Sequence, residues 1–155
     1  MNSPPDGFDG DSHNAGASDA ERNDLLNRLQ RVLIELQSST HGGPRQSHHY
    51  DSLKRLVERH PKAALLSIDR IDAGHRPPLL MSLSALGRRI LPDLMDVLRT
   101  RPRSEHALVL YMLTVRGMVG RIDRDDLIKL RSDLHRHPDV IAVLNRSLDY
   151  IAGLG

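Results

Sequence analysis

The nine histidines are the first residues to test for chemistry, and their spacing does not predict a metal site. His48 and His49 are adjacent, so their side chains diverge on a helix. His135 and His137 are two positions apart, which does not place both on one helical face, although a loop could bring them together. The sequence contains no His-Glu-x-x-His motif and no pair of carboxylates near the histidines at ligand spacing. We therefore expect no metal ion and no other cofactor.

Motifs for nucleophilic catalysis and for phosphate binding are also missing from the sequence. The serines are scattered, and no Gly-x-Ser-x-Gly motif is present. The glycines do not form a phosphate-cradling loop that is followed by lysine. The acidic pairs Asp93/Asp96 and Asp125/Asp126 fall in expected first helical turns, where carboxylates stabilise the helix dipole. The sequence thus predicts no catalytic residues and a protein that is not an enzyme.

The basic residues are more informative, because 19 of the 22 lysines and arginines are arginine. The guanidinium group suits bidentate contacts to carboxylate or phosphate. In a stack of helix pairs, the turns inside the pairs line up along one edge, and their basic residues would form a positive ridge. The candidate partner-binding residues of this ridge are Arg59, Lys62, Arg99, Arg101, Arg103 and Arg136. The equally weighted alternative is that these side chains only complement helix C-termini and aid solubility.

Hydrophobic residues at helical spacing predict eight helices and no strand. The sequence divides into four parts of different character. The predicted parts are a disordered acidic tail (1–17), an N-terminal amphipathic helix (18–38), a flexible link (39–47) and a helical-repeat domain (48–155).

For two of the predicted helices, the sequence indicates which residues should be buried in the core. The first begins with a capping box formed by Ser18 and Glu21. Its apolar face is expected to comprise Leu25, Leu29, Val32, Leu33 and Leu36. The long helix after Ser104 is expected to bury Leu108, Tyr111, Met112 and Val115, with Val119 as a further candidate. The first helix should pack on the repeats behind it through its apolar stripe, and the alternative is that the stripe mediates self-association.

A shift of 33 positions superimposes much of the C-terminal half of the chain on itself. Gly87 falls on Gly120, and Gly120 falls on Gly153. The apolar run 107–111 likewise falls on the run 140–144. A fixed period of this length is typical of stacked helix-turn-helix units.

Residues 77–153 resemble HEAT-like (armadillo-type) helical repeats. An Ala-Leu-Gly sequence at 85–87 closes one helix, and the next helix opens with a proline in Ile-Leu-Pro-Asp-Leu-Met-Asp-Val-Leu, residues 90–98. The resemblance implies an all-α fold in which antiparallel helix pairs form a short right-handed stack.

Composition and charge indicate the class of protein. Without cysteine, disulfides and thiolate metal sites are excluded. No apolar run approaches the roughly 18 residues of a membrane span, and residues 1–10 lack the features of a signal peptide. Residues 1–24 carry a net charge of −5, so the remainder carries +7. These features predict a cytoplasmic protein that makes no membrane contact.

These observations together predict a non-catalytic protein–protein interaction module, an adaptor or scaffold that uses a stacked-helix surface. The alternative is a protein that binds the nucleic-acid backbone through the arginine-rich edge. The expected partner is a protein, and an acidic protein would suit the ridge, whereas the alternative partner is nucleic acid bound through its phosphates. No aromatic residue lies among the ridge arginines, which disfavours base stacking on a single strand. The oligomeric state stays open.

Overall fold

A computed structural model describes residues 19–38 and 44–153, and within these ranges the chain forms eight α-helices and no strand. The prediction of an all-α chain with eight helices is thereby confirmed for the described residues. The expected acidic tail (1–17) and the expected N-cap Ser18 lie outside them, as do residues 39–43 of the expected link.

Short turns connect the helices, and several turns contain a 3-10 segment. The α-helices are α2 (Asp19–Ser38), α3 (Pro44–Arg59), α4 (Pro61–Ser67), α5 (Arg76–Ser84), α6 (Leu91–Thr100), α7 (Ser104–Val115), α8 (Arg124–Asp133) and α9 (Pro138–Gly153). The 3-10 segments are η2 (Ile68–Arg70), η3 (Ala73–His75), η4 (Gly87–Ile90) and η5 (Arg121–Asp123). Three helices begin with proline, which suits a position where no intrahelical N–H bond is needed. The helix α3 begins four residues before the start expected at 48, so the last four residues of the expected link are helical.

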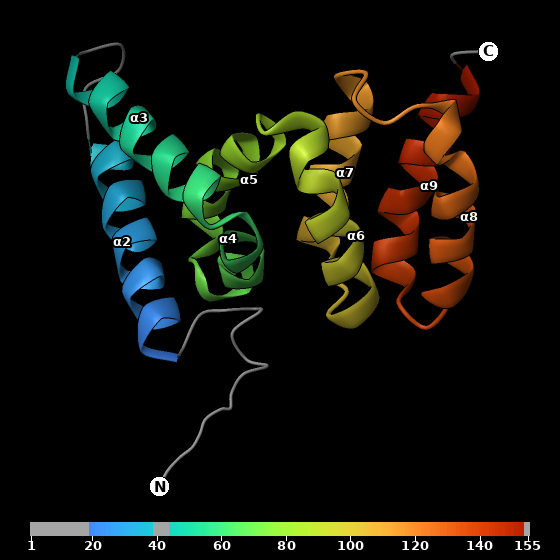
Figure 1. Cartoon of the computed structure of the whole chain (residues 1–155), viewed down its shortest axis with the longest axis horizontal. Helices are drawn as coiled ribbons and strands as arrows, with labels where there is room; N and C mark the ends of the chain where they lie inside the picture. Colours follow the sequence, from blue (N-terminus) through green and yellow to red (C-terminus); the bar gives the residue numbers. More distant parts are fainter. Residues whose placement is uncertain (1–18, 39–43, 154–155) are drawn as a thin grey trace, which may run out of the picture.

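The helices contact one another in two rows (Figure 1). In one row, α2 packs on α4 and α4 packs on α6. In the other row, α3 packs on α5, α5 on α7, and α7 on α9. Members of consecutive pairs also touch, namely α2 with α3, α4 with α5, α6 with α7 and α8 with α9. Among the described helices, α6 and α8 lack a comparable interface, although α7 and α9 share the most extensive one.

The 33-residue shift in the sequence also relates helix bounds in the structure. Shifting α6 (91–100) by this amount gives the bounds of α8 (124–133). The turns before these two helices differ in backbone conformation. Gly87 has a φ of 66°, which favours glycine, whereas Gly120 has a φ of −127°. The positions of these helices thus repeat, while the conformation of the preceding turn does not.

The face of α2 consists of leucines, as the sequence predicts. Four of the five expected residues are buried, Val32 is half-buried, and Leu26 joins the buried set. This face packs against α3 and α4. Full burial of a leucine side chain contributes roughly 1.5–3 kcal/mol. The helix is therefore integral to the core.

The helix α7 differs from the prediction, because it buries more than one face. Val115 is 45% exposed, and Leu108, Tyr111 and Met112 are only half-buried. The further candidate, Val119, is buried but lies beyond the end of the helix. The buried apolar residues are Ala107, Val109, Leu110 and Leu113. The reason is that α7 contacts α5, α6 and α9, so it is surrounded by other helices. A helix that is apolar on all sides belongs in such a position, and its periodicity does not identify one buried stripe.

Ion pairs join successive turns at both ends of the helices. Arg76, at the start of α5, donates to Glu105 in the first turn of α7 at 3.0 Å. Arg88 in η4 donates to Asp123 in η5, also at 3.0 Å. Asp123 accepts a further hydrogen bond from the Gly120 N–H at 3.0 Å. The hydrogen-bonded Arg88 guanidinium lowers the pKa of the Asp123 carboxyl below its usual value.

The core contains a buried imidazole, His106, in the first turn of α7. Its Nε2 lies 2.7 Å from the Leu65 carbonyl oxygen, to which it donates in the neutral tautomer. Its Nδ1 has no hydrogen-bond partner among the described residues. Burial lowers the pKa of His106, against the opposing effects of the Leu65 carbonyl and of the nearby Asp69 and Glu105.

The leucine face of α2 gives the first prediction. Leu29 is 0% exposed, so Leu29→Ala should lower the free energy of unfolding by about 2–5 kcal/mol through lost burial and a residual cavity. Ile34 lies on the same helix but is 52% exposed, so Ile34→Ala should have an effect below about 1 kcal/mol. Urea unfolding followed by circular dichroism measures both values. Equal losses would show that α2 is not packed on the domain.

The buried His106 imidazole should make the stability of the protein depend on pH. Because the folded pKa of His106 is lowered, the unfolded chain binds a proton that the folded chain does not. Stability should therefore be complete above about pH 6.5, the unfolded pKa, and should fall as the pH drops towards the folded pKa. Urea unfolding at about pH 7.5 and about pH 5.5 brackets this window.

Two variants test the assignment to His106. His106→Gln keeps a donor for the Leu65 carbonyl and removes the titrating ring, so its loss of stability between the two pH values should be smaller. His135 is exposed in the turn between α8 and α9, and His135→Gln should keep the wild-type loss. An unchanged loss in His106→Gln would contradict the assignment.

Candidate functional site

Three of the six basic residues predicted to form a ridge have carboxylate partners inside the protein. Lys62 Nζ donates to Asp96 Oδ2 at 2.6 Å, which ties α4 to α6. Arg101 and Arg103 both approach Asp69 Oδ2, at 3.6 and 3.1 Å. Asp69 belongs to η2, so it fixes the α6–α7 turn to the turn that follows α4. These three cations are therefore engaged in joining helices.

The other three predicted residues, Arg59, Arg99 and Arg136, are exposed and form no ion pair with a described residue. They lie in separate places. Arg59 lines a hollow between α2 and α3, Arg99 lines an opening between α6 and α8, and Arg136 lies in the α8–α9 turn. The structure thus brings Arg101 and Arg103 together on one carboxylate, while Arg59, Arg99 and Arg101 line three different hollows.

The hollow that contains Arg59 gathers arginines from both of the helices that form it. Its volume is about 270 Å³. Arg28 and Arg31 come from α2, and Arg55 and Arg59 come from α3. The remaining lining residues are Val32, Ser52 and Leu56. We call this hollow, with its four arginines, the arginine groove.

The sequence of each helix explains why these side chains meet. Buried residues of α2 and α3 form the interface between the helices, and each lining apolar residue precedes a buried one. Val32 stands next to Leu33, and Leu56 stands next to Val57, so both are half-buried at the edge of the interface. The arginines of each helix are three or four positions apart, which places them on one side of it. Packing α2 on α3 therefore brings the two arginine pairs together over an apolar floor.

The charge of the arginine groove is only partly neutralised. Arg28 Nε lies 3.2 Å from Asp24 Oδ2, one turn earlier in α2. Arg31, Arg55 and Arg59 form no ion pair with a described residue, and all three are exposed. A carboxylate or phosphate that enters between the helices would therefore meet three uncompensated guanidinium groups. Such groups bind anions through charge-assisted, bidentate hydrogen bonds.

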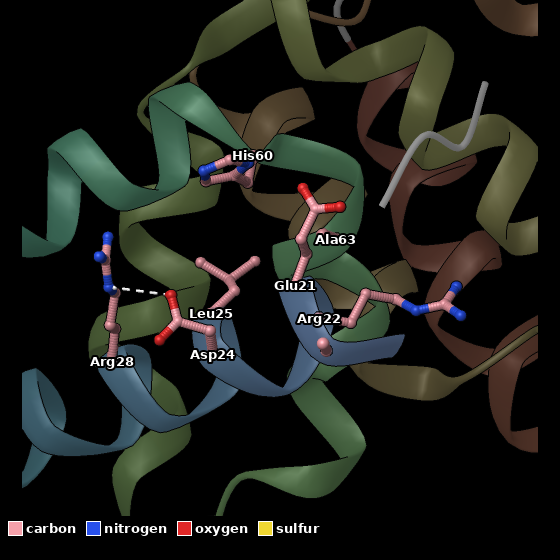
Figure 2. A pocket seen from close by; sticks show the side chains of 8 residues that line it. Glu21, Arg22, Asp24, Leu25, Arg28, His60 and Ala63 are labelled. Atoms are coloured by element: carbon pink, nitrogen blue, oxygen red, sulfur yellow. Dashed lines mark ion pairs between the residues drawn. The ribbon is translucent and has the colours of Figure 1, made fainter. Parts of the chain in front are cut away.

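A second hollow of about 290 Å³ continues along α2 and shares Arg28 with the arginine groove. It lies between the first turns of α2 and the junction of α3 and α4 (Figure 2). In Figure 2, Asp24 faces Arg28, with which it forms an ion pair, and His60 lies across the hollow at the junction. This hollow has mixed charge, since Glu21 and Asp24 lie among its lining residues. The two hollows together form a path along α2 that changes from mixed to positive charge.

The site offers anion binding and does not offer a metal-binding cluster. In residues 19–38 and 44–153, no group of three or more His, Asp or Glu side chains is arranged to hold a metal ion. The same part of the chain contains no helix with the length and hydrophobicity needed to cross a membrane.

Sequence reasoning identified Arg59 but missed Arg28, Arg31 and Arg55. The signal was present in their spacing, because two arginine pairs at helical intervals stood on helices expected to be neighbours. It was missed because the ridge was assembled from turns, whereas the arginine groove runs between helix bodies.

A search of protein-family models, curated proteins and solved structures finds no match to this chain.

The ion pairs of Asp69 limit how far Arg101 and Arg103 are available to bind an anion from outside the protein. Asp69→Asn should release Arg101 and Arg103 and so increase retention on a heparin column at low salt. The two guanidinium groups are about half exposed, so stability should fall by no more than about 0.5–1 kcal/mol. Asp133→Asn, at an exposed position of α8, removes the same charge and should increase retention less. If both variants elute together, Asp69 does not mask these arginines.

Proposed function

We propose that this protein is a non-catalytic interaction module that binds an acidic segment of a partner protein in the arginine groove. The observation that carries the proposal is the set of four arginines on two facing helices, three of them without an ion-pair partner among the described residues. Burying or desolvating a cation is costly unless an anion accompanies it. A surface that gathers several exposed cations in one hollow is therefore suited to an anionic partner.

The floor of the arginine groove favours a protein over a nucleic acid. Val32 and Leu56 are half-buried between the arginines and offer an apolar contact. An acidic peptide segment that also carries an apolar side chain can place that side chain on Val32 and Leu56 and its carboxylates beside the arginines of α2 and α3. A phosphate backbone has no apolar group to place there. A single strand would also need aromatic side chains for its bases, and none lines the arginine groove.

The arrangement of helices supports a stack similar to HEAT-like repeats. Helices contact one another in two rows, and α6 and α8 have bounds that differ by the same 33 residues that relate their sequences. Stacked helix pairs commonly present an extended surface to another protein and contain no chemistry of their own. An adaptor or scaffold role fits this arrangement.

A binding assay with a defined probe tests the proposal. The probe is a fluorescein-labelled peptide of about ten residues, rich in glutamate with two leucines at its centre, and binding is followed by fluorescence anisotropy. Arg31→Glu/Arg55→Glu should weaken binding about tenfold or more, because it replaces attraction by repulsion on both rims. The matched control, Arg116→Glu/Arg121→Glu, makes the same charge change at exposed positions outside the arginine groove and should alter binding little.

The same assay distinguishes the competing partner. An oligothymidine of equal charge should bind more weakly than the peptide at physiological salt. Tighter binding of the oligonucleotide, with an affinity that falls steeply as salt rises, would favour a protein that binds the nucleic-acid backbone. Equal weakening by the two double variants would show that overall charge, and not the arginine groove, controls binding.

A further inference from the structure

The opening between α6 and α8 is larger than the arginine groove, with a volume of about 540 Å³. It lies where α6 and α8 share no extensive interface while α7 and α9 are packed closely together. The row formed by α2, α4 and α6 thus makes no extensive contact with α8. Openings of this volume are in the usual range for binding sites.

Apolar side chains form the base of the opening. Leu91 and Met95 of α6 are 9% and 8% exposed, and Val119 and Leu127 are almost fully buried beside them. Pro92 adds an exposed apolar ring at the edge. The base can therefore accept an apolar side chain from a partner without leaving a polar group unsatisfied.

The charges around the opening have opposite signs at its two ends. The Arg88–Asp123 ion pair holds the starts of α6 and α8 at the same end, and Asp126 lies in the first turn of α8. Arg99 lies in the last turn of α6, about 10 Å further along a helix from Pro92. Neither Asp126 nor Arg99 forms an ion pair with a described residue. Because Arg88 and Asp123 neutralise each other, the charged lining leaves one unpaired acid, Asp126, at one end of the opening and one unpaired base, Arg99, at the other.

We infer that the opening between α6 and α8 binds a short amphipathic helix of a partner protein. A basic residue of that helix meets Asp126, an acidic residue two turns away meets Arg99, and the apolar side chains between them enter over Leu91 and Met95. Two turns of helix span about 10 Å, which is the rise along α6 from Pro92, near its start, to Arg99, while Asp126 lies at the corresponding start of α8. A helix suits the position because α6 already packs on a helix, α4, on its other side. This site is separate from the arginine groove and does not depend on the function proposed for it.

A selection experiment supplies the ligand. The probe is a phage-displayed library of helical peptides with lysine and glutamate fixed seven positions apart and with apolar residues varied between them. Selected peptides should bind the full chain saturably and should shift the NMR amide signals of α6 and α8. Failure to select any binder, or shifts confined to α2 and α3, would overturn the inference. Concentration-dependent shifts of α6 and α8 in the protein alone would assign the opening to a second copy of the chain and would also overturn it.

A charge reversal tests the proposed orientation. Arg99→Glu makes both ends of the opening acidic, so the affinity for a selected peptide should fall roughly fivefold. The same peptide with its glutamate replaced by lysine should then bind the variant better than the original peptide does. The matched control is Arg116→Glu, an exposed position outside the opening, which should leave the preference unchanged. Equal loss in the two variants would contradict the assignment of Arg99.

Discussion

The burial of α7 is the constraint on which the packing of this protein depends. Six of its residues from 106 to 114 are buried and the other three, Leu108, Tyr111 and Met112, are half-buried, and the helix contacts α5, α6 and α9. Each large apolar side chain buried there contributes roughly 1.5–3 kcal/mol. Of the polar side chains that are carried inside, Thr114 donates locally to the Leu110 carbonyl at 2.8 Å, whereas His106 bonds to the Leu65 carbonyl of α4 at 2.7 Å. The helix α7 therefore joins the first part of the chain to the last, and neither part can move away without exposing it.

The same packing explains where the hollows lie. The helices α7 and α9 pack closely, whereas the helices paired with them, α6 and α8, share no comparable interface. The opening between α6 and α8 has an apolar base. The arginine groove has another origin. The buried apolar faces of α2 and α3 meet, and residues at the edges of those faces line the groove. Both hollows therefore result from the burial of apolar helix faces, and the charged residues around them determine what they can bind.

The local sequence pattern predicted the helices of this fold far better than the contacts between them. The leucines of α2 were correctly assigned because that helix has one buried face. The buried face predicted for α7 was wrong, because the periodicity of apolar residues does not identify the buried side of a helix that contacts several other helices. The ion pairs escaped prediction for another reason. Asp69 and Arg103 are 34 positions apart, and only tertiary packing decides that their side chains meet. The six predicted cations could therefore be named from the sequence, but their division into paired and unpaired residues could not.

Whether a predicted cation is paired or unpaired depends on the elements that lie next to it. Arg101 and Arg103 lie in a turn whose neighbour, η2, presents a carboxylate, and Arg88 faces Asp123 in the same way. The pair α2–α3 contacts α4, α5 and η3. Arg31, Arg55 and Arg59 have no carboxylate partner among the described residues. An unpaired cation on a stable helix costs the fold little while it stays hydrated, and it is available to an anion from outside. The unpaired arginines of α2 and α3 are thus free to act in binding, which is why the arginine groove, and not the ridge, is the stronger candidate.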